Sequence, residues 1–257
     1  MKEIIKLPSK GKLYPEGHVF KDKEEIEIRL LTTDDEDMLT TKSLIKSGEL
    51  VNMVVKEVIG NANLDVNSLL AGDRDAILIY SRLYSFGTEY ESKCRCKYCE
   101  AIDFYKFDIS NVPINFLEKA PISPYENAFL YKMPNGDEIV FKLMTVELSK
   151  VIDKDNKTRE QFNKKSANYK GKEKNVTNFL KNTIISINKK TDFESILNYI
   201  KVWVPAGENG SRAFRKYIRD ISPNVLFQSE FYCLNCGTIN KEVDLEYNEN
   251  FFWADLW

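Results

Sequence analysis

The chain contains two similar segments, CKYCEAIDFYKFDI from Cys96 to Ile109 and CLNCGTINKEVDL from Cys233 to Leu245. Each opens with a CxxC pair and continues into a strand-like run that ends in FDI or VDL. Two cysteines on one tight turn offer two sulfur ligands, so two such turns complete the tetrahedral four-sulfur shell of a structural zinc. The sequence therefore predicts one zinc per chain, shared by the two halves. The predicted ligands are Cys96, Cys99, Cys233 and Cys236.

Two other interpretations of the CxxC pairs stay open at this point, namely redox dithiols and buried cysteines without a metal. A catalytic zinc would keep an open coordination position and normally use histidine or carboxylate ligands. The only histidine, His18, is far from both pairs in sequence, so no catalytic metal is predicted. Cys94, two residues before the first pair, is expected to be a buried thiol outside the shell.

Motifs typical of enzymes are missing from the sequence. His18 has no serine or cysteine nucleophile motif around it, and neither GxxxxGK[ST] nor GxGxxG occurs. The acidic group GDRD, Gly72 to Asp75, is interpreted as a helix start, with Asp73 as the cap and Arg74 in an ion pair. We therefore expect a non-enzymatic protein without a small-molecule substrate.

Charge and hydropathy restrict the environment of the chain. A net charge of −2 argues against a general affinity for nucleic acid. No run approaches the roughly 20 apolar residues of a membrane helix, and the start MKEIIKLPSKGK lacks an apolar signal core. Cysteines used as metal ligands suit a reducing compartment. Folding in a cytoplasm, without a membrane partner, is expected.

A longer comparison of the chain with itself suggests an internal duplication. EIEIRLLT (Glu25–Thr32) aligns with EIVFKLMT (Glu138–Thr145) at an offset of 113 residues, whereas the two CxxC pairs are offset by 137. Tyr80 and Arg82 match Tyr217 and Arg219 at that second offset. The polar stretch 153–174 is the natural place for the insertion that the change of offset requires. Chance similarity of short apolar strands is the alternative.

The predicted fold is α+β, with two strand–helix–zinc-ribbon halves related by pseudo-two-fold symmetry and sharing the zinc. The predicted domains are 1–111, a Pro-rich linker 112–124, and 125–257. Strands are expected at 24–32, 88–95, 101–109, 127–133, 138–144, 225–232 and 238–246. Helices are expected at 34–59 (broken near Gly48), 67–86, 145–165, 174–188, 192–201 and 210–221. Helix caps are expected from Thr33 and the acids after it, and from Thr145 with Glu147.

Three surface questions stay open at the level of sequence. The arm from Leu7 to Pro15 could cap the first strand or reach a neighbouring subunit. The C-terminal aromatic residues could complete the core or anchor a partner; they are Phe251, Phe252, Trp253 and Trp257. The lysines of the 153–174 stretch could be solvated, or could touch phosphates in a nucleic-acid-associated zinc-ribbon accessory protein, the second functional hypothesis. These lysines are Lys164, Lys165, Lys170, Lys172 and Lys174.

Several motifs together resemble a known family. They are LPSKGKLYP (Leu7–Pro15), LLTTDDEDML (Leu30–Leu39), GDRDAILIYSRLYSFGTEY (Gly72–Tyr90) with the CxxC that follows it, FYCLNCG, and the terminal FF. With these motifs the chain resembles, over nearly its whole length, the baseplate hub and hub assembly proteins of T-even-type, contractile-tailed bacteriophages. Lys97 departs from the proline common after the leading cysteine, and the 153–174 insertion is a second departure.

The resemblance implies a non-enzymatic protein that forms part of the baseplate hub or helps to build it. Other hub or tail proteins are the implied partners, and nucleic acid is not expected among them. The implied location is the virion tail baseplate, the host cytoplasm during assembly, or both.

Overall fold

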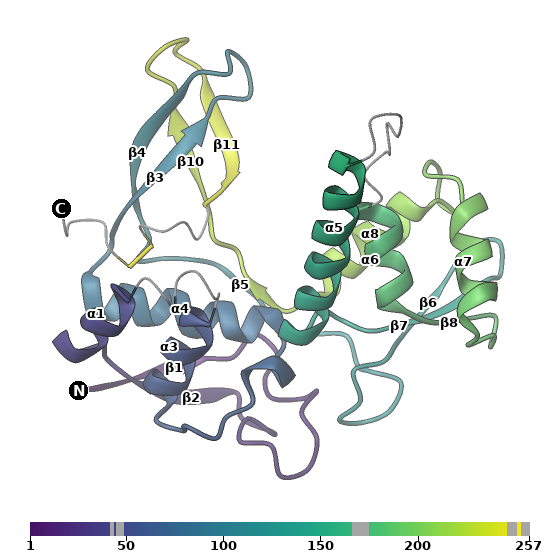
Figure 1. The fold of residues 1–257 in the computed structure, drawn as a ribbon, viewed down its shortest axis with the longest axis horizontal. Coiled ribbons are helices and arrows are strands. Elements are labelled where there is room, and N and C mark those ends of the chain that lie inside the picture. Colours follow the sequence, from purple (N-terminus) through teal and green to yellow (C-terminus); the bar gives the residue numbers. More distant parts are fainter. Residues whose placement is uncertain (42–43, 45–48, 166–174, 246–250, 253–257) are drawn as a thin grey trace.

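Two lobes and a pair of β-hairpins make up the chain, which we describe from a computed structural model (Figure 1). The structure describes residues 1–257 except 42–43, 45–48, 166–174, 246–250 and 253–257. Helices and antiparallel sheets occur together, which confirms the α+β class. No helix in the described part is long and apolar enough to cross a membrane.

The first lobe pairs a short hairpin-like sheet with helices. Strand β1 (Lys2–Lys6) runs antiparallel to β2 (Glu25–Arg29), and the alternating residues Ile26 and Ile28 of β2 are buried. The helical elements are α1 (Thr33–Leu39), α3 (Leu50–Ile59), the 3₁₀ turn η1 (Val66–Ser68) and α4 (Ala71–Phe86). Strand β1 was not predicted, because KEIIK places its two isoleucines side by side and so lacks the apolar–polar alternation that EIEIR of β2 shows.

The second lobe is a three-stranded antiparallel sheet covered by helices, at the right of Figure 1. Its strands, in the order β6-β7-β8, are β6 (Phe129–Lys132), β7 (Glu138–Phe141) and β8 (Ile184–Ile187). Its helices are α5 (Val146–Lys165), α6 (Asn175–Thr183), α7 (Phe193–Val202) and α8 (Ser211–Ile221). Phe214 of α8 packs its ring edge-on against Phe141 of β7, with centroids 5.3 Å apart, so the apolar face of α8 lies on the sheet.

The helix predicted over 174–188 is wrong in its second half. Helix α6 ends at Thr183, and the next four residues form β8, which pairs with β7. The sequence IISI from Ile184 is rich in β-branched residues, which favour a pleated, half-buried surface. Pairing with a strand more than forty residues earlier therefore outweighs the helical tendency of the preceding segment.

Backbone contacts join the two lobes. Ala71 N–H donates to the carbonyl of Met144, and Val146 N–H donates to that of Leu69. The segment 112–124, expected as a linker, contains β5 (Ile114–Asn115), which pairs with β9 (Asn224–Val225). At Gly72 the helix start approaches β9 so closely that a Cβ atom would lie 1.9 Å from the Pro223 carbonyl oxygen. Only glycine fits at this position without a backbone shift.

Asp73 does not cap α4 as predicted; it binds the N-terminal arm instead. Its buried carboxylate accepts hydrogen bonds from the Ser9 N–H at 2.9 Å, the Ser9 hydroxyl, and the Tyr14 hydroxyl at 2.7 Å. The Tyr14 oxygen in turn accepts the Leu70 N–H at 3.2 Å. Burial raises the pKa of both Asp73 and Tyr14. The arm therefore packs on its own chain, and the LPSKGKLYP and GDRD motifs meet. The predicted ion pair of Arg74 is confirmed, with Asp75 as its partner.

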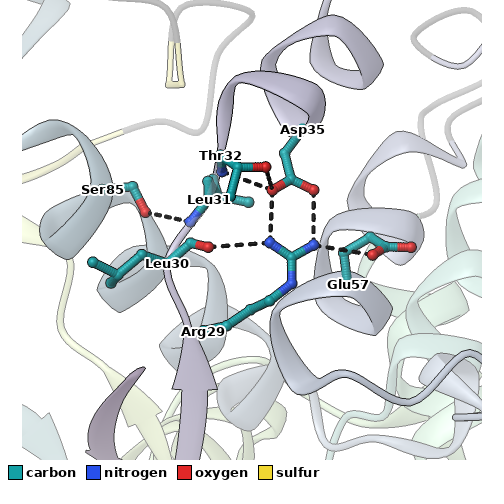
Figure 2. Close-up of polar contacts among 7 residues, drawn as sticks. All are labelled: Arg29, Leu30, Leu31, Thr32, Asp35, Glu57 and Ser85. Atoms are coloured by element: carbon teal, nitrogen blue, oxygen red, sulfur yellow. Dashed lines mark hydrogen bonds and ion pairs between the residues drawn. The ribbon is translucent and has the colours of Figure 1, made fainter. Parts of the chain in front are cut away.

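Arg29, at the end of β2, fixes the first helices to the sheet (Figure 2). Its guanidinium forms a two-pronged ion pair with Asp35 of α1, with N···O distances of 2.6 and 2.8 Å, and reaches Glu57 of α3 at 3.0 Å. Asp35 also accepts the N–H and the hydroxyl of Thr32. The helix cap is therefore Thr32, one residue before the predicted Thr33.

This cluster predicts a specific dependence of stability on pH. The Arg29 guanidinium, helped by Thr32, lowers the pKa of Asp35 to about 2, so the ionised carboxylate stabilises the folded state. Its contribution is complete above the unfolded pKa of about 4 and is lost as the pH falls towards 2. At pH 6 we expect Asp35→Asn to unfold more easily than the wild type by about 2 kcal/mol.

The measurement is the urea midpoint of both proteins between pH 6 and pH 3. The gap is expected to narrow below about pH 4, because Asp35 then takes up a proton in the unfolded wild type while the folded state keeps its carboxylate ionised, and the variant has no titrating group at this position. Acid effects elsewhere in the chain are common to both proteins. A gap that stays constant down to pH 3 would show that the Asp35 charge does not act through this pair.

A second arginine, Arg82 of α4, is buried at 2% exposure. Its guanidinium donates to three main-chain carbonyls: Gly87 at 2.5 Å, Glu89 at 2.6 Å and Phe251 at 3.0 Å. The rings of Phe86 and Tyr90 also lie close to the guanidinium, and each ring centroid is 5.9 Å from the guanidinium carbon. One side chain thus connects the end of α4, the start of the first hairpin and the C-terminal part of the chain.

Candidate metal centre

The two predicted CxxC segments form neighbouring hairpins that project together from the body (Figure 1). The first consists of β3 (Glu89–Arg95) and β4 (Ile102–Asp108), the second of β10 (Gln228–Tyr232) and β11 (Ile239–Asp244). Their facing sides touch through Tyr105 and Phe231, with ring centroids 4.2 Å apart. Each CxxC pair occupies the turn between the two strands of its hairpin, so the cysteines lie at the tips.

The two turns have the same backbone geometry. In the first, Cys96 N–H donates to the Ala101 carbonyl at 2.9 Å, and Glu100 N–H donates to the Cys96 carbonyl at 3.0 Å. In the second, Cys233 and Gly237 make the corresponding bonds at 3.0 and 2.9 Å. Glu100 and Gly237 both adopt left-handed conformations, with φ of 60° and 71°. Glycine takes this conformation without strain, whereas glutamate is held in it by the turn.

The turns bring all four cysteine sulfurs within 4.8 Å of one another. The Sγ atoms of Cys96 and Cys236 are 3.7 Å apart, and those of Cys99 and Cys233 are 3.6 Å apart. A zinc ion with Zn–S bonds of about 2.3 Å at tetrahedral angles separates its sulfurs by about 3.8 Å. The cluster therefore fits a four-coordinate metal of zinc's size and preference for sulfur. No second group of metal-ligating side chains occurs among the described residues.

Donors around the sulfurs suit thiolates. The Cys96 sulfur faces the Tyr98 N–H and the Asn240 side-chain amide, each at 3.4 Å. The Asn235 amide lies 3.5 Å from the Cys99 sulfur. Asn240 is fully buried, and its oxygen accepts the Lys97 N–H at 2.8 Å, so a residue of the second hairpin holds the turn of the first. Such contacts orient metal ligands and offset their charge.

These surroundings change the acidity of the thiols. Burial raises the pKa of Cys96, but the N–H donors of Cys99 and Tyr98 and the amide of Asn240 outweigh it and lower the pKa to about 6. The amide of Asn235 lowers the pKa of Cys99. At Cys236, contacts with Thr238 lower the pKa, but burial and the hydrogen-bonding contacts with Cys99 and Cys233 together raise it above its ordinary value.

Comparison with known proteins identifies the family. The family model described as T4 bacteriophage base plate protein matches residues 1–253. The chain belongs to this family. No curated protein and no solved structure matches it. For this base plate protein, membership indicates a structural role in a phage tail, in association with other tail proteins and located in the virion tail.

Of the C-terminal aromatic residues of the base plate protein, two lie in the core and two lie outside the residues that the structure describes. Phe251 and Phe252 are buried, at 2% and 7% exposure, in a cluster with Tyr90 and Phe227, which is the core alternative for these two rings. Trp253 and Trp257 lie outside the described residues. So do Lys170, Lys172 and Lys174 of the charged stretch.

His18 and Cys94 are placed outside the centre. His18 stacks on Tyr14 in the N-terminal arm, with centroids 4.3 Å apart, and its Nε2 lies 3.2 Å from the Ser68 hydroxyl. Cys94 is buried, at 4% exposure, and is not among the four clustered cysteines. The sequence did not single out Asn235 and Asn240. Asn235 directly precedes Cys236, and Asn240 lies inside a predicted strand, and neither position by itself indicates a contact with a cysteine sulfur.

Proposed function

We propose that this base plate protein is a non-enzymatic structural or assembly component of the hub of a contractile tail, stabilised by one structural zinc. The family match supports the baseplate role, and the four-cysteine cluster supports the metal. The observation that carries the metal proposal is the sulfur spacing: two hairpins far apart in the sequence place their sulfurs 3.6 and 3.7 Å apart across the cluster, as a tetrahedral shell requires. With four sulfurs bound, the metal has no open position for substrate or water.

The zinc would hold the hairpins against each other. Cys96 and Cys99 would bind it from the first turn, and Cys233 and Cys236 from the second. When bound, the ion supplies positive charge that stabilises four neighbouring thiolates. The protein's own contribution is the pair of turns and the amides of Asn235 and Asn240, which hold the sulfurs in place.

We further propose that the halves 1–111 and 125–257 arose by duplication and are related by a pseudo-two-fold axis, with 112–124 as the connection. Support comes from the turns, where equivalent hydrogen bonds and left-handed residues recur at the 137-residue offset. Strands β2 and β7 also both lead into a helix capped by a threonine, Thr32 and Thr145. Strand β8 has no equivalent in the first half, because the sheet of the first lobe has two strands and the sheet of the second lobe has three.

Sedimentation of lysates from infected cells tests the proposed role. The protein would be followed by mass spectrometry across the gradient and in purified virions, after nuclease treatment of half of each sample. We expect it to sediment with tail or baseplate particles regardless of nuclease. Presence in virions would indicate a permanent component, and presence only with immature particles an assembly factor. Sedimentation with nucleic acid that is lost after nuclease would favour the zinc-ribbon accessory protein instead.

A further inference from the structure

Helix α8 has two sharply different faces. Its buried or half-buried apolar residues pack inward, led by Phe214 and Ile218. At about 100° per residue, the four cations of the helix fall within an arc of about 100° on the opposite side. These cations are Arg212, Arg215, Lys216 and Arg219. Three of them are exposed and Arg215 is half-buried. We call these four residues the cationic stripe.

Within the part of the chain that the structure describes, the stripe has almost no counter-charge. Among the described residues, no carboxylate forms an ion pair with Arg212, Arg215 or Lys216, and Arg219 approaches only Asp220, at 3.8 Å. Arg215 bonds the Ser211 carbonyl of its own helix. The protein carries a net charge of −2, so the stripe is a local concentration of positive charge.

Arginine is over-represented in the stripe. The chain has 29 lysines and 8 arginines, yet the stripe contains three arginines and one lysine. Arginine is enriched at protein interfaces and lysine is depleted, because the planar guanidinium is weakly hydrated and binds carboxylates in pairs of hydrogen bonds. A face that served only for solubility would be expected to follow the lysine-rich composition of the rest of the chain.

Four other arginines of the chain already have partners. Arg29 pairs with Asp35, Arg74 with Asp75 and Arg95 with Glu100, while Arg82 binds carbonyls. The stripe differs from these arginines, because its only polar contacts among the described residues are the Arg215 bond to the Ser211 carbonyl and the Arg219 approach to Asp220, which leaves most of its N–H donors for a partner. Negatively charged groups on a partner could accept hydrogen bonds from these N–H donors and balance their charge.

We propose that the cationic stripe of α8 docks an acidic surface of another protein of the tail, with carboxylates as the recognised groups. The inference rests on the proposed baseplate role. Nucleic acid is less well matched, because the stripe contains no aromatic residue for stacking on bases and its four charges span only two turns of helix. The family match also indicates that the surroundings of the chain are tail proteins.

The test compares two variants with equal change of charge. One reverses the stripe, R212E/R215E/K216E/R219E; the control reverses four exposed lysines elsewhere, K154E/K157E/K190E/K201E. The probe is tail assembly particles purified from cells infected with a phage that lacks this protein. Binding of each full-length protein is measured by co-sedimentation at 50, 150 and 300 mM NaCl, with circular dichroism and metal content confirming folding.

We expect wild-type binding to weaken as salt rises, the stripe variant to bind at least about tenfold more weakly at 150 mM, and the control to bind as the wild type does. Should the stripe variant misfold, R212Q/R219Q replaces it, because this variant changes only two exposed side chains; we expect it, too, to bind more weakly than the wild type.

Equal binding by the stripe variant and the wild type would overturn the stripe proposal and leave the baseplate role standing. Failure of the wild type to bind particles would count against the baseplate role itself. Binding that disappears after nuclease would assign the stripe to nucleic acid and overturn the proposed protein partner.

Discussion

Replacing Cys96 with serine is expected to abolish stoichiometric metal binding and to lower the free energy of unfolding by about 4 kcal/mol or more. Cys96 is buried, at 1% exposure, and its sulfur receives N–H groups from Tyr98 and Asn240. A serine hydroxyl is a poor zinc ligand, and without the ion the remaining thiolates repel one another. Metal analysis should give one zinc per wild-type chain and none per variant, and urea unfolding should show the loss of stability.

The fifth cysteine provides the matched control. Cys94 lies two residues away on β3 and is also buried, at 4% exposure, but is not part of the cluster. Cys94→Ala should keep one zinc per chain and lose only about 1–2 kcal/mol from the core. A wild-type protein without zinc, or a Cys96→Ser variant that still binds one equivalent, would contradict the proposed centre.

Replacing Arg82 with methionine is expected to destabilise the protein by about 3–5 kcal/mol, the second-largest effect we predict. Methionine fills similar space but leaves the carbonyls of Gly87, Glu89 and Phe251 without the guanidinium donors they now have. Arg82→Lys should be intermediate, because one ammonium group cannot reach three carbonyls arranged around a planar fork. Urea unfolding monitored by fluorescence would measure each change.

Arg219 provides the exposed control for the Arg82 substitution. It matches Arg82 at the offset between the two CxxC pairs, yet its side chain is 74% exposed. Arg219→Met should therefore change the free energy of unfolding by no more than about 0.5 kcal/mol. If the two methionine variants were equally stable, the buried carbonyl contacts of Arg82 would contribute nothing net to folding.

Local sequence patterns were sufficient to predict the hairpins and the grouping of the cysteines. A CxxC turn between two alternating strands is defined within about fifteen residues, and thiolate chemistry then favours bringing two such turns to one ion. Thr145, predicted to cap a helix, does so through its hydroxyl and the Leu148 N–H. These features depend on neighbours in the sequence, which is why periodicity and spacing reveal them.

Contacts between residues that are far apart in the sequence were not predicted. Asp73 has the position of a helix cap, but it binds Ser9 and Tyr14, about sixty residues earlier. The residues of strand β8 were predicted as helix, because their pairing with β7, more than forty residues earlier, cannot be inferred from neighbouring residues in the sequence. Asn240, inside a strand, gave no signal that it bridges the two turns. Each depends on which elements the folded chain brings together, and a single sequence does not state this.

The separation of the two cysteine turns also sets an order of events during synthesis. Cys99 leaves the ribosome 137 residues before Cys236, the last member of the cluster. At about 5–20 residues per second, this interval is roughly 7–27 seconds. During that time the first hairpin carries only two of the four cysteines that later cluster, and if they form the proposed zinc centre, their thiols are open to other metals and to oxidants. Completion of the N-terminal half is therefore tied to translation of the C-terminal half.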